Sequence, residues 1–340
     1  MAEPLLQVQD LHTRFTTPTG VVHAVRGVSF AVRRGETVGL VGESGSGKSV
    51  TALSIMRLLP EPPARIRAGR VLLDGEDLLG LPPRAMQDVR GRRIAMVFQD
   101  PFASLNPTMR LGDQVAEAIQ AHGRVSRREA LARSLDLFRA VHLPAPEARL
   151  HQYPHQVSGG QRQRVMIAMA FALRPDVLIA DEPTTALDVT VQAQIMALMS
   201  EFQERTGAAI LLITHDLGLV AEMCDRVLVM YAWQIVEEGS ARQVFHSPRH
   251  PYTVGLLESL PQLHEERASR LRSIPGQPPD LADLPTGCAF ADRCPLVMEV
   301  CRREAPPVHS AGQGSWARCH LLAETPPLPS AGSRAPGGAQ

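Results

Sequence analysis

The sequence predicts an α/β fold, and three features of the chain support this prediction. Apolar runs with the length of buried strands recur along the sequence. One of them, residues 36–41, leads into a glycine-rich loop that is followed by a helix-like segment at residues 50–59. Another, residues 177–180, ends in two adjacent carboxylates. A strand, a glycine-rich turn and a helix in succession are typical of α/β proteins, whose ligands bind at the carboxyl ends of the strands.

The glycine-rich loop fits the pattern G-x-x-x-x-G-K-[ST] of a P-loop. Its glycines allow a tight turn that points successive backbone N–H groups toward one centre, which forms an anion-binding nest. Lys48 would place its charge on the β- and γ-phosphates of a nucleotide, and Ser49 would offer its hydroxyl to Mg²⁺. A loop that fits the pattern by chance is the alternative, and the strand and helix beside it argue against that. The predicted nucleotide contacts in this segment are Gly42, Glu43, Ser44, Gly45, Ser46, Gly47, Lys48, Ser49 and Val50.

Composition narrows the class of protein. The chain has 340 residues, enough for one large and one smaller domain, with 35 Lys and Arg against 35 Asp and Glu. This balance argues against a strongly basic nucleic-acid-binding protein, and we expect no nucleic-acid partner. No apolar run is long enough to span a membrane, and the N-terminus lacks the features of a signal peptide. We therefore expect a cytoplasmic protein whose cysteines are thiols or metal ligands rather than disulfides.

The sequence pattern also predicts secondary structure in two further regions. Residues 5–41 alternate between apolar and polar positions, which predicts an antiparallel sheet leading into the P-loop. Phe15 is a lone aromatic residue there; it can be a stacking surface for adenine or a core residue of an edge strand, and the sequence favours neither. Residues 111–122 and 127–142 repeat apolar positions with helical periodicity, which predicts a separate helical subdomain.

Polar residues also stand at strand ends and at a helix start. Ser158 is an N-cap residue before two glycines and a long helix, so this helix start is a second anion site. Asp181 and Glu182 end a buried strand; in a P-loop protein the first would hold Mg²⁺ through water and the second would orient the attacking water. Gln99 ends an apolar strand in a polar amide. His215 ends another; a lone His is normally structural, but at the carboxyl end of a parallel strand it lies where ligands bind.

In order and spacing, these motifs resemble the ATP-binding subunits of ABC transporters over residues 5–240. The resemblance implies an α/β fold with a RecA-like core, an antiparallel β subdomain and a helical subdomain, with ATP and Mg²⁺ as cofactors. It implies that Glu182, His215 and Gln99 are catalytic. We further predict that Phe15 contacts the nucleotide and that Ser49, Gln99 and Asp181 hold Mg²⁺. The signature that acts on a partner's ATP is Ser158, Gly159, Gly160 and Gln161, and the D-loop aspartate is Asp188.

The chain departs from the family pattern at two places. Val157 stands where the family more often has Leu, which is a small apolar change. Trp233 and Gln234 stand where the family usually has Gly and a basic residue. We expect this substitution to open a tight turn, and we expect the turn to lie away from the nucleotide motifs.

Residues 250–261 and 274–281 look like the tail of the ATPases of oligopeptide/dipeptide (peptide/nickel) importers. Of the two paralogous ATPase types in those importers, residues 45–51 and 274–279 look like the D-type. The resemblance implies an ATP-hydrolysing subunit that powers import of di- and oligopeptides. It implies a paralogous ATPase subunit, two transmembrane permease subunits and an extracytoplasmic substrate-binding protein as partners. The chain would then be peripheral at the cytoplasmic face of the inner membrane. The alternatives are the same role for nickel, glutathione or sugar, a non-transport ABC ATPase, and a regulatory subunit that binds ATP without turnover.

The domain boundaries follow from these assignments. We expect an ABC ATPase domain at residues 1–258, with its helical subdomain at about residues 100–170. A C-terminal extension with clustered cysteines would cover residues 259–322. Residues 323–340 lack a core pattern and are expected to be a disordered tail.

The extension holds four cysteines in a segment with few large apolar residues, and such a segment needs a covalent or metal staple. From the residues alone, an iron–sulfur cluster, a zinc site and free thiols all stay open. Resemblance to the importer tail implies a structural [4Fe–4S] cluster without a redox role in hydrolysis. Its ligands would be Cys288, Cys294, Cys301 and Cys319.

Overall fold

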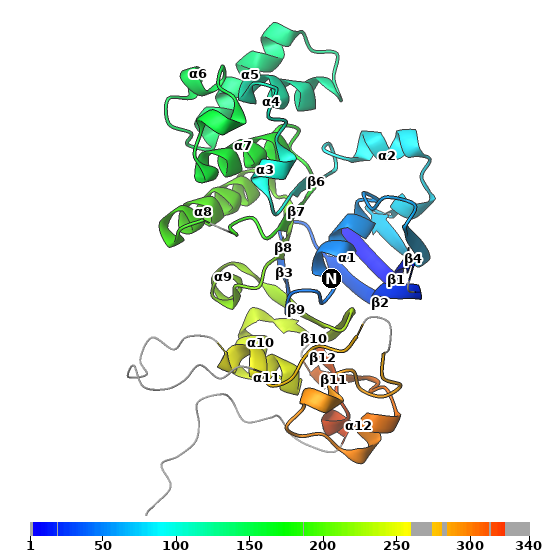
Figure 1. The fold of residues 1–340 in the computed structure, drawn as a ribbon. Coiled ribbons are helices and arrows are strands. Elements are labelled where there is room, and N and C mark those ends of the chain that lie inside the picture. The colour runs from blue at the N-terminus through cyan, green and yellow to red at the C-terminus, as the bar shows by residue number, and fades with distance from the viewer. Residues whose placement is uncertain are drawn as a thin grey trace, which may run out of the picture. The chain divides into compact units, whose positions relative to one another are not determined.

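The computed structural model describes residues 3–18, 20–185, 187–259, 274–280, 284–312 and 314–323 (Figure 1). The chain forms two compact units, each built from several stretches of sequence. The first unit comprises Met1–Gln7, Ala31–Thr37 and Val71–Ile213, and the second comprises Val8–Phe30, Val38–Arg70 and Thr214–Gln340. Of the tail predicted to be disordered, residues 324–340 lie outside the described residues.

The first unit contains three parallel strands, β6 (Ile94–Val97), β7 (Val177–Asp181) and β8 (Ala209–Ile213), in the order β8-β7-β6. β7 pairs in parallel with both neighbours, and every residue of β7 and β8 is buried. Strands covered on both faces read as continuous apolar runs, which is why the sequence shows no alternation here. A short strand, β5 (Glu76–Asp77), pairs with Leu72 and Leu73 at the end of β4 (Ala64–Leu73).

The first unit also contains helices. They are α2 (Pro83–Val89), α3 (Pro101–Ser104), α4 (Leu111–Gln120), α5 (Arg127–Ala140), α6 (Pro146–Arg149), α7 (Gly159–Phe171) and α8 (Val189–Thr206) (Figure 1). α4 and α5 confirm the helical periodicity of residues 111–122 and 127–142, and both pack against α7. Within α5 the buried positions are Ala130, Ser134 and Phe138, spaced four residues apart on one helix face.

The second unit is built on two sets of strands. β1 (Leu6–Thr17), β2 (Gly20–Val32) and β4 lie mostly in this unit, in the order β2-β1-β4. β3 (Thr37–Val41) pairs in parallel with β9 (Arg226–Tyr231), which pairs with β10 (Gln234–Ser240) in antiparallel. The sheet continues through β12 (Ser315–Arg318) to β11 (Val308–Gly312). Its helices are α1 (Lys48–Ile55), α9 (Leu217–Met223), α10 (Ala241–His246), α11 (Pro251–Glu258) and α12 (Glu299–Arg303).

A two-residue turn joins β9 to β10. Tyr231 pairs with Gln234, and the two residues between them, Ala232 and Trp233, have φ angles of 44° and 66°. Positive φ at both turn positions is what a tight hairpin of this hand requires. The expectation that Trp233 would open the turn is therefore wrong, because both residues adopt the left-handed conformation that glycine usually supplies.

The part of the chain that the structure describes contains no helix that is both long and apolar enough to cross a membrane.

Candidate nucleotide-binding site

The P-loop lies in the second unit, between the end of β3 and the start of α1. Gly42, Gly45 and Gly47 have φ angles of 153°, 78° and 106°, which L side chains rarely adopt. A Cβ atom at Gly42 would lie 2.2 Å from the carbonyl oxygen of Met230, and one at Gly47 would lie 2.8 Å from that of Ala24. The loop therefore needs glycine for two reasons, its backbone conformation and the neighbouring backbone that packs against it.

The contrast between Gly42 and Gly45 allows a stability test. Both have positive φ, but a Cβ at Gly45 meets nothing within 4 Å. We expect Gly42→Ala to lower the free energy of unfolding by about 2–4 kcal/mol, because the methyl group displaces the Met230 backbone. Gly45→Ala should cost only about 1 kcal/mol, from backbone strain alone. Urea unfolding of the full chain measures both, and equal losses would contradict the steric argument.

Lys48 begins α1, and its side chain folds back over the loop. The residue is only 5% exposed, and its ammonium group donates hydrogen bonds to the carbonyl oxygens of Gly42 (2.8 Å) and Glu43 (2.9 Å). Lys48 is also the only lysine in the sequence. These bonds hold one fixed positive charge beside the backbone N–H groups of the loop, which is the arrangement that binds phosphate oxygens.

One polar atom of the loop lacks a partner. The hydroxyl of Ser46 is buried and makes no hydrogen bond in the structure. A buried hydroxyl without a partner costs about 1–3 kcal/mol, so native structures keep such a group mainly where a ligand, ion or water satisfies it. Together with the glycine turn and Lys48, this hydroxyl shows that the residues present fit a nucleotide phosphate group.

The other residues of the second unit that are predicted to act on the nucleotide differ in their exposure to solvent. Ser44 and Gly45 are exposed, and Ser49 and Val50 are half-buried in the first turn of α1. Phe15 is half-buried in β1, so stacking on adenine stays a prediction. His215 is exposed and immediately precedes Asp216, the N-cap residue of α9.

In the first unit, the structure brings together two residues predicted to be catalytic. The side-chain amide of Gln99 donates a hydrogen bond to the Glu182 carboxylate, with a nitrogen–oxygen distance of 3.0 Å. The hydroxyl of Thr185 donates to the same oxygen at 2.8 Å. Sequence reasoning missed Thr185, although its place three residues after Glu182 in one turn was available as a signal. Asp181, the residue before Glu182, is buried at the end of β7.

Glu182 also has an unusual backbone. Its φ angle is 46°, and its N–H group donates to the carbonyl oxygen of Ile213 at 2.8 Å. A left-handed conformation at a residue with a side chain costs of order 1–3 kcal/mol and is concentrated at functional sites. Glu182 adopts this conformation directly after the last residue of β7.

The signature segment begins α7. Ser158 caps this helix in a reciprocal pair with Gln161: the Ser158 hydroxyl accepts from the Gln161 N–H (3.4 Å), and the Gln161 side chain accepts from the Ser158 N–H (3.3 Å). This confirms the predicted N-cap. Gly160 faces α8, where a Cβ would meet Val191 at 2.8 Å. Asp188, the predicted D-loop residue, caps α8 by accepting from the Val191 N–H at 2.9 Å.

Trp233 contacts the P-loop, so the expectation that it lies away from the nucleotide motifs is wrong. Its indole N–H donates to the carbonyl oxygen of Gly45 at 2.9 Å, and its backbone N–H donates to that of Ser46 at 3.0 Å. The reason is the strand order: β9 lies beside β3, so the β9–β10 turn meets the loop that follows β3. Trp233 is thus a P-loop contact that the sequence analysis missed.

The prediction of a [4Fe–4S] cluster in the extension is wrong. Among the described residues, no group of three or more His, Cys, Asp or Glu side chains is placed to hold a metal ion. The four predicted ligands are free cysteines that line a cavity of about 10 Å³, with room for about one water molecule. The four are Cys288, Cys294, Cys301 and Cys319.

Three of these cysteines are buried enough for their acidity to change. Burial raises the pKa of Cys288 to about 11 and that of Cys319 to about 12, and it also raises the pKa of Cys294. Burial disfavours the thiolate form of these three side chains. The described residues thus do not support an iron–sulfur cluster, and ATP and Mg²⁺ remain as the predicted cofactors.

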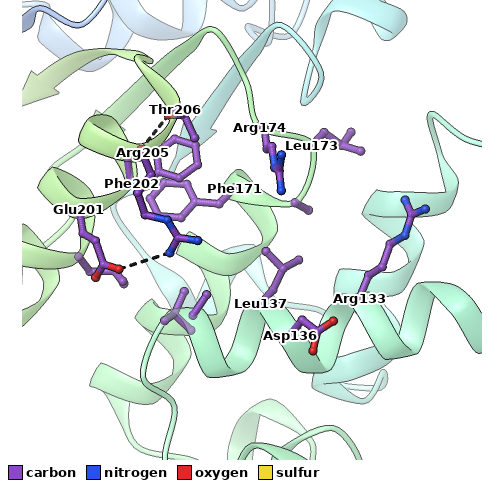
Figure 2. Close-up of a pocket in the computed structure, with 14 residues that line it drawn as sticks. Arg133, Asp136, Leu137, Phe171, Leu173, Arg174, Glu201, Phe202, Arg205 and Thr206 are labelled. Atoms are coloured by element: carbon purple, nitrogen blue, oxygen red, sulfur yellow. Dashed lines mark hydrogen bonds and ion pairs between the residues drawn. The ribbon is translucent and has the colours of Figure 1, made fainter.

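A cavity of about 760 Å³ lies elsewhere in the first unit, among residues of α5, α7 and α8 (Figure 2). Phe171 and Phe202 stack in it with their ring centroids 3.6 Å apart, and Arg205 and Glu201 form an ion pair at 3.3 Å (Figure 2). None of the residues predicted to bind nucleotide lines this cavity. The volume of a cavity alone therefore does not identify the candidate nucleotide-binding site.

Two family models match the chain. Residues 25–185 match the model described as ABC transporter. Residues 236–301 match the model described as the C-terminal region of oligopeptide/dipeptide transporters.

Curated relatives are similar along most of the chain. A probable peptide ABC transporter ATP-binding protein, y4tR of Sinorhizobium fredii, is 53% identical over 94% of this chain and 95% of its own length. The oligopeptide transport ATP-binding protein OppD of Bacillus subtilis is 50% identical over 94% of this chain and 89% of its own. The dipeptide transport ATP-binding protein DppD of the same organism is 52% identical over 89% of this chain and 90% of its own length.

Solved structures show the same fold. The ATP-binding cassette MJ0796, in a dimeric post-hydrolysis state bound to ADP and Pi, has a TM-score of 0.63 and 27% identity, covering 70% of this chain and 99% of its own. The protein cbiO1 of Clostridium perfringens, part of the ABC transporter complex cbiONQ, has a TM-score of 0.60 and 28% identity, covering 72% of this chain and 91% of its own.

Proposed function

Because the chain belongs to the ABC transporter family of ATP-binding proteins, we propose that it hydrolyses ATP to power the import of di- and oligopeptides through a membrane ABC transporter. One observation supports peptides as the cargo. About half of the residues, along most of the chain, are identical to those of proteins named as peptide, oligopeptide and dipeptide transport ATP-binding proteins. The matched C-terminal region supports the same branch of the family.

In this proposal the P-loop binds the nucleotide. Its N–H groups and Lys48 hold the β- and γ-phosphates, and the buried Ser46 hydroxyl gains the partner that it lacks in the structure. Ser49, Gln99 and Asp181 are proposed to hold Mg²⁺, Asp181 through water, and the bound ion would offset the negative charge of the phosphates.

The carboxylate at the end of β7 acts on water. Glu182 orients the water that attacks the γ-phosphate, while Gln99 and Thr185 fix its carboxylate through their hydrogen bonds. His215 is proposed to stabilise charge on the γ-phosphate. These roles rest on residue type, position and the hydrogen bonds described above.

The proposed assembly contains more than this chain. The start of α7, with its half-exposed Gly159 and Gly160, would face the ATP of a second ATPase subunit, and Asp188 would bridge to that subunit. We propose a paralogous ATPase as this partner, two permease subunits in the membrane, and a substrate-binding protein outside it. The chain would then sit at the cytoplasmic face of the membrane as a peripheral subunit.

This assembly predicts low activity for the isolated chain. One chain carries a single signature segment, and a complete site needs the signature of a second subunit. We expect ATP hydrolysis by the isolated chain to be at least about tenfold slower than in the full complex, because the γ-phosphate lacks the second set of helix N–H groups. The measurement is phosphate release by the monomeric chain and by the complex reconstituted in liposomes with its binding protein and peptide.

Two controls decide the interpretation. The complex carrying Glu182→Gln should release little phosphate, which excludes a contaminating ATPase. Peptide uptake by the liposomes should require ATP on the side of this subunit. Full turnover by a strictly monomeric sample would contradict the partner assignment, and ATP-driven uptake of nickel or sugar without peptide uptake would contradict the cargo class.

A further inference from the structure

A residue of the C-terminal extension reaches the P-loop. Arg293 forms a two-pronged ion pair with Glu43, the second residue of the loop, and the two nitrogen–oxygen distances are 2.7 and 2.9 Å. The Arg293 side chain is 4% exposed and that of Glu43 is 27% exposed. The two residues are 250 positions apart in the sequence. A paired, bidentate geometry with little solvent access is among the stronger forms of ion pair.

Contacts with the extension and with β9 hold Arg293 in this position. Its Nε donates to the carbonyl oxygen of Pro275 at 2.9 Å, and its Nη1 lies 3.3 Å from the hydroxyl of Tyr231. The guanidinium also lies 5.8 Å from the ring centre of Tyr231 and 5.9 Å from that of Phe290. The hydrogen bond to Glu43 is the largest cause that raises the pKa of Arg293, so the side chain stays charged. Because several groups bind its guanidinium, the Arg293 side chain has little freedom to move with the P-loop.

An aromatic cluster of Tyr231, Tyr252 and Phe290 binds the backbone of the loop. The hydroxyl of Tyr252 accepts a hydrogen bond from the N–H of Glu43 at 2.9 Å, and burial raises the pKa of this hydroxyl, which stays protonated. The Tyr252 ring packs on Tyr231 and Phe290, with centroid distances of 4.5 and 5.4 Å. Both the side chain and the main chain of Glu43 are therefore tied to residues that come after β9.

Glu43 passes this restraint to the phosphate-binding lysine. Its carbonyl oxygen accepts a hydrogen bond from the Lys48 ammonium group at 2.9 Å. Displacing Glu43 would shift that oxygen and with it the position of the charge that meets the phosphates. The path runs from Arg293 through Glu43 to Lys48 by direct contacts.

We propose that Arg293 is a positioning residue for the nucleotide, through which the C-terminal extension holds the P-loop in its binding conformation. The proposal rests on the proposed function, in that the P-loop must bind ATP. It assigns the extension a part in nucleotide affinity beyond the proposed roles of the motif residues. The nucleotide does not touch Arg293; the residue acts through Glu43.

The test compares two arginines of the extension in the full chain. Arg293→Gln removes the buried pair, whereas Arg302→Gln removes an exposed pair with Asp292, whose side chains are 53% and 85% exposed. We expect Arg293→Gln to raise the Kd for ATP about tenfold, since the phosphate-binding charge loses its fixed position. Arg302→Gln should leave the Kd unchanged. Titration with a fluorescent ATP analogue and competition by ATP gives both constants.

Two further measurements separate positioning from general damage. Glu43→Gln breaks the same pair from the loop side without touching the extension, and the double variant Glu43→Gln with Arg293→Gln should lose no more affinity than the worse single variant. In the assembled complex, Arg293→Gln should raise the KM for ATP and leave kcat at saturating ATP unchanged. Folding is checked by circular dichroism and thermal unfolding.

The possible results are distinct. If the wild-type chain binds ATP no better than Lys48→Ala, the proposed function fails and this inference with it. If the wild type binds ATP but folded Arg293→Gln and Glu43→Gln bind it equally well, only the inference is overturned. Additive losses in the double variant would also overturn it. Should Arg293→Gln not fold, Glu43→Gln alone decides.

Discussion

Replacing Lys48 by alanine is expected to weaken ATP binding by about a hundredfold or more. The side chain is the buried cation of the P-loop and holds two backbone carbonyl groups of the loop. A hydrogen bond to a charged group contributes about 1.5–3 kcal/mol, and about 2.7 kcal/mol corresponds to a hundredfold change in affinity. Titration of the full chain with ATP and Mg²⁺ measures the effect.

The control for this variant removes a positive charge elsewhere in the same unit. Arg65 is exposed on β4, so Arg65→Ala changes the net charge equally without touching the loop. It should bind ATP like the wild type. If Lys48→Ala and Arg65→Ala have the same affinity as the wild type, the nucleotide does not bind at this loop.

Glu182→Gln is expected to keep ATP affinity and to lower the hydrolysis rate by about a hundredfold or more, which is the range for removing a general base. Glutamine keeps the shape and one oxygen that can accept from Gln99 or Thr185, but it cannot take a proton from water. The measurements are the Kd for ATP of the chain and steady-state phosphate release by the assembled complex.

A second carboxylate provides the matched control. Glu204 is exposed near the end of α8, and Glu204→Gln removes the same charge from the first unit. This variant should hydrolyse ATP at the wild-type rate. Hydrolysis by Glu182→Gln at that same rate would show that another group activates the water.

Local sequence patterns predicted much of the fold. The run before Gly42 folds as β3, and the segment after the loop folds as α1, which begins at Lys48, two residues earlier than the sequence suggested. The capping pair of Ser158 and Gln161 starts α7 where N-cap chemistry requires it. These features depend on residues within a few positions of one another, and a single sequence contains that information.

Contacts across the sequence were not predictable in the same way. Trp233 and Arg293 touch the P-loop because β9 pairs with β3 and because an aromatic cluster joins the extension to β9. Strand order is a property of the assembled sheet, so the residues next to Trp233 or Arg293 in the sequence do not indicate which distant segment each one contacts. In the sequence, the only unusual feature of Trp233 was that it differs from the residue the family usually has at this position.

The cysteine prediction failed for a related reason. The extension was judged too poor in apolar residues to fold without a metal. In the structure Phe290 packs edge-on against Tyr231 and also against Tyr252, both of which come before the extension. A segment can use a core supplied by residues distant in sequence, and counting apolar residues within the segment cannot detect this.

The presence of a single lysine side chain has a practical consequence for chemical labelling. Reagents that acylate amines have one side-chain target in this protein, Lys48, in addition to the N-terminal amine. That target is buried against two loop carbonyls, so its reaction reports when the side chain swings free of Gly42 and Glu43. Acylation counted by mass spectrometry therefore follows the state of the phosphate-binding loop without any engineered tag or substitution.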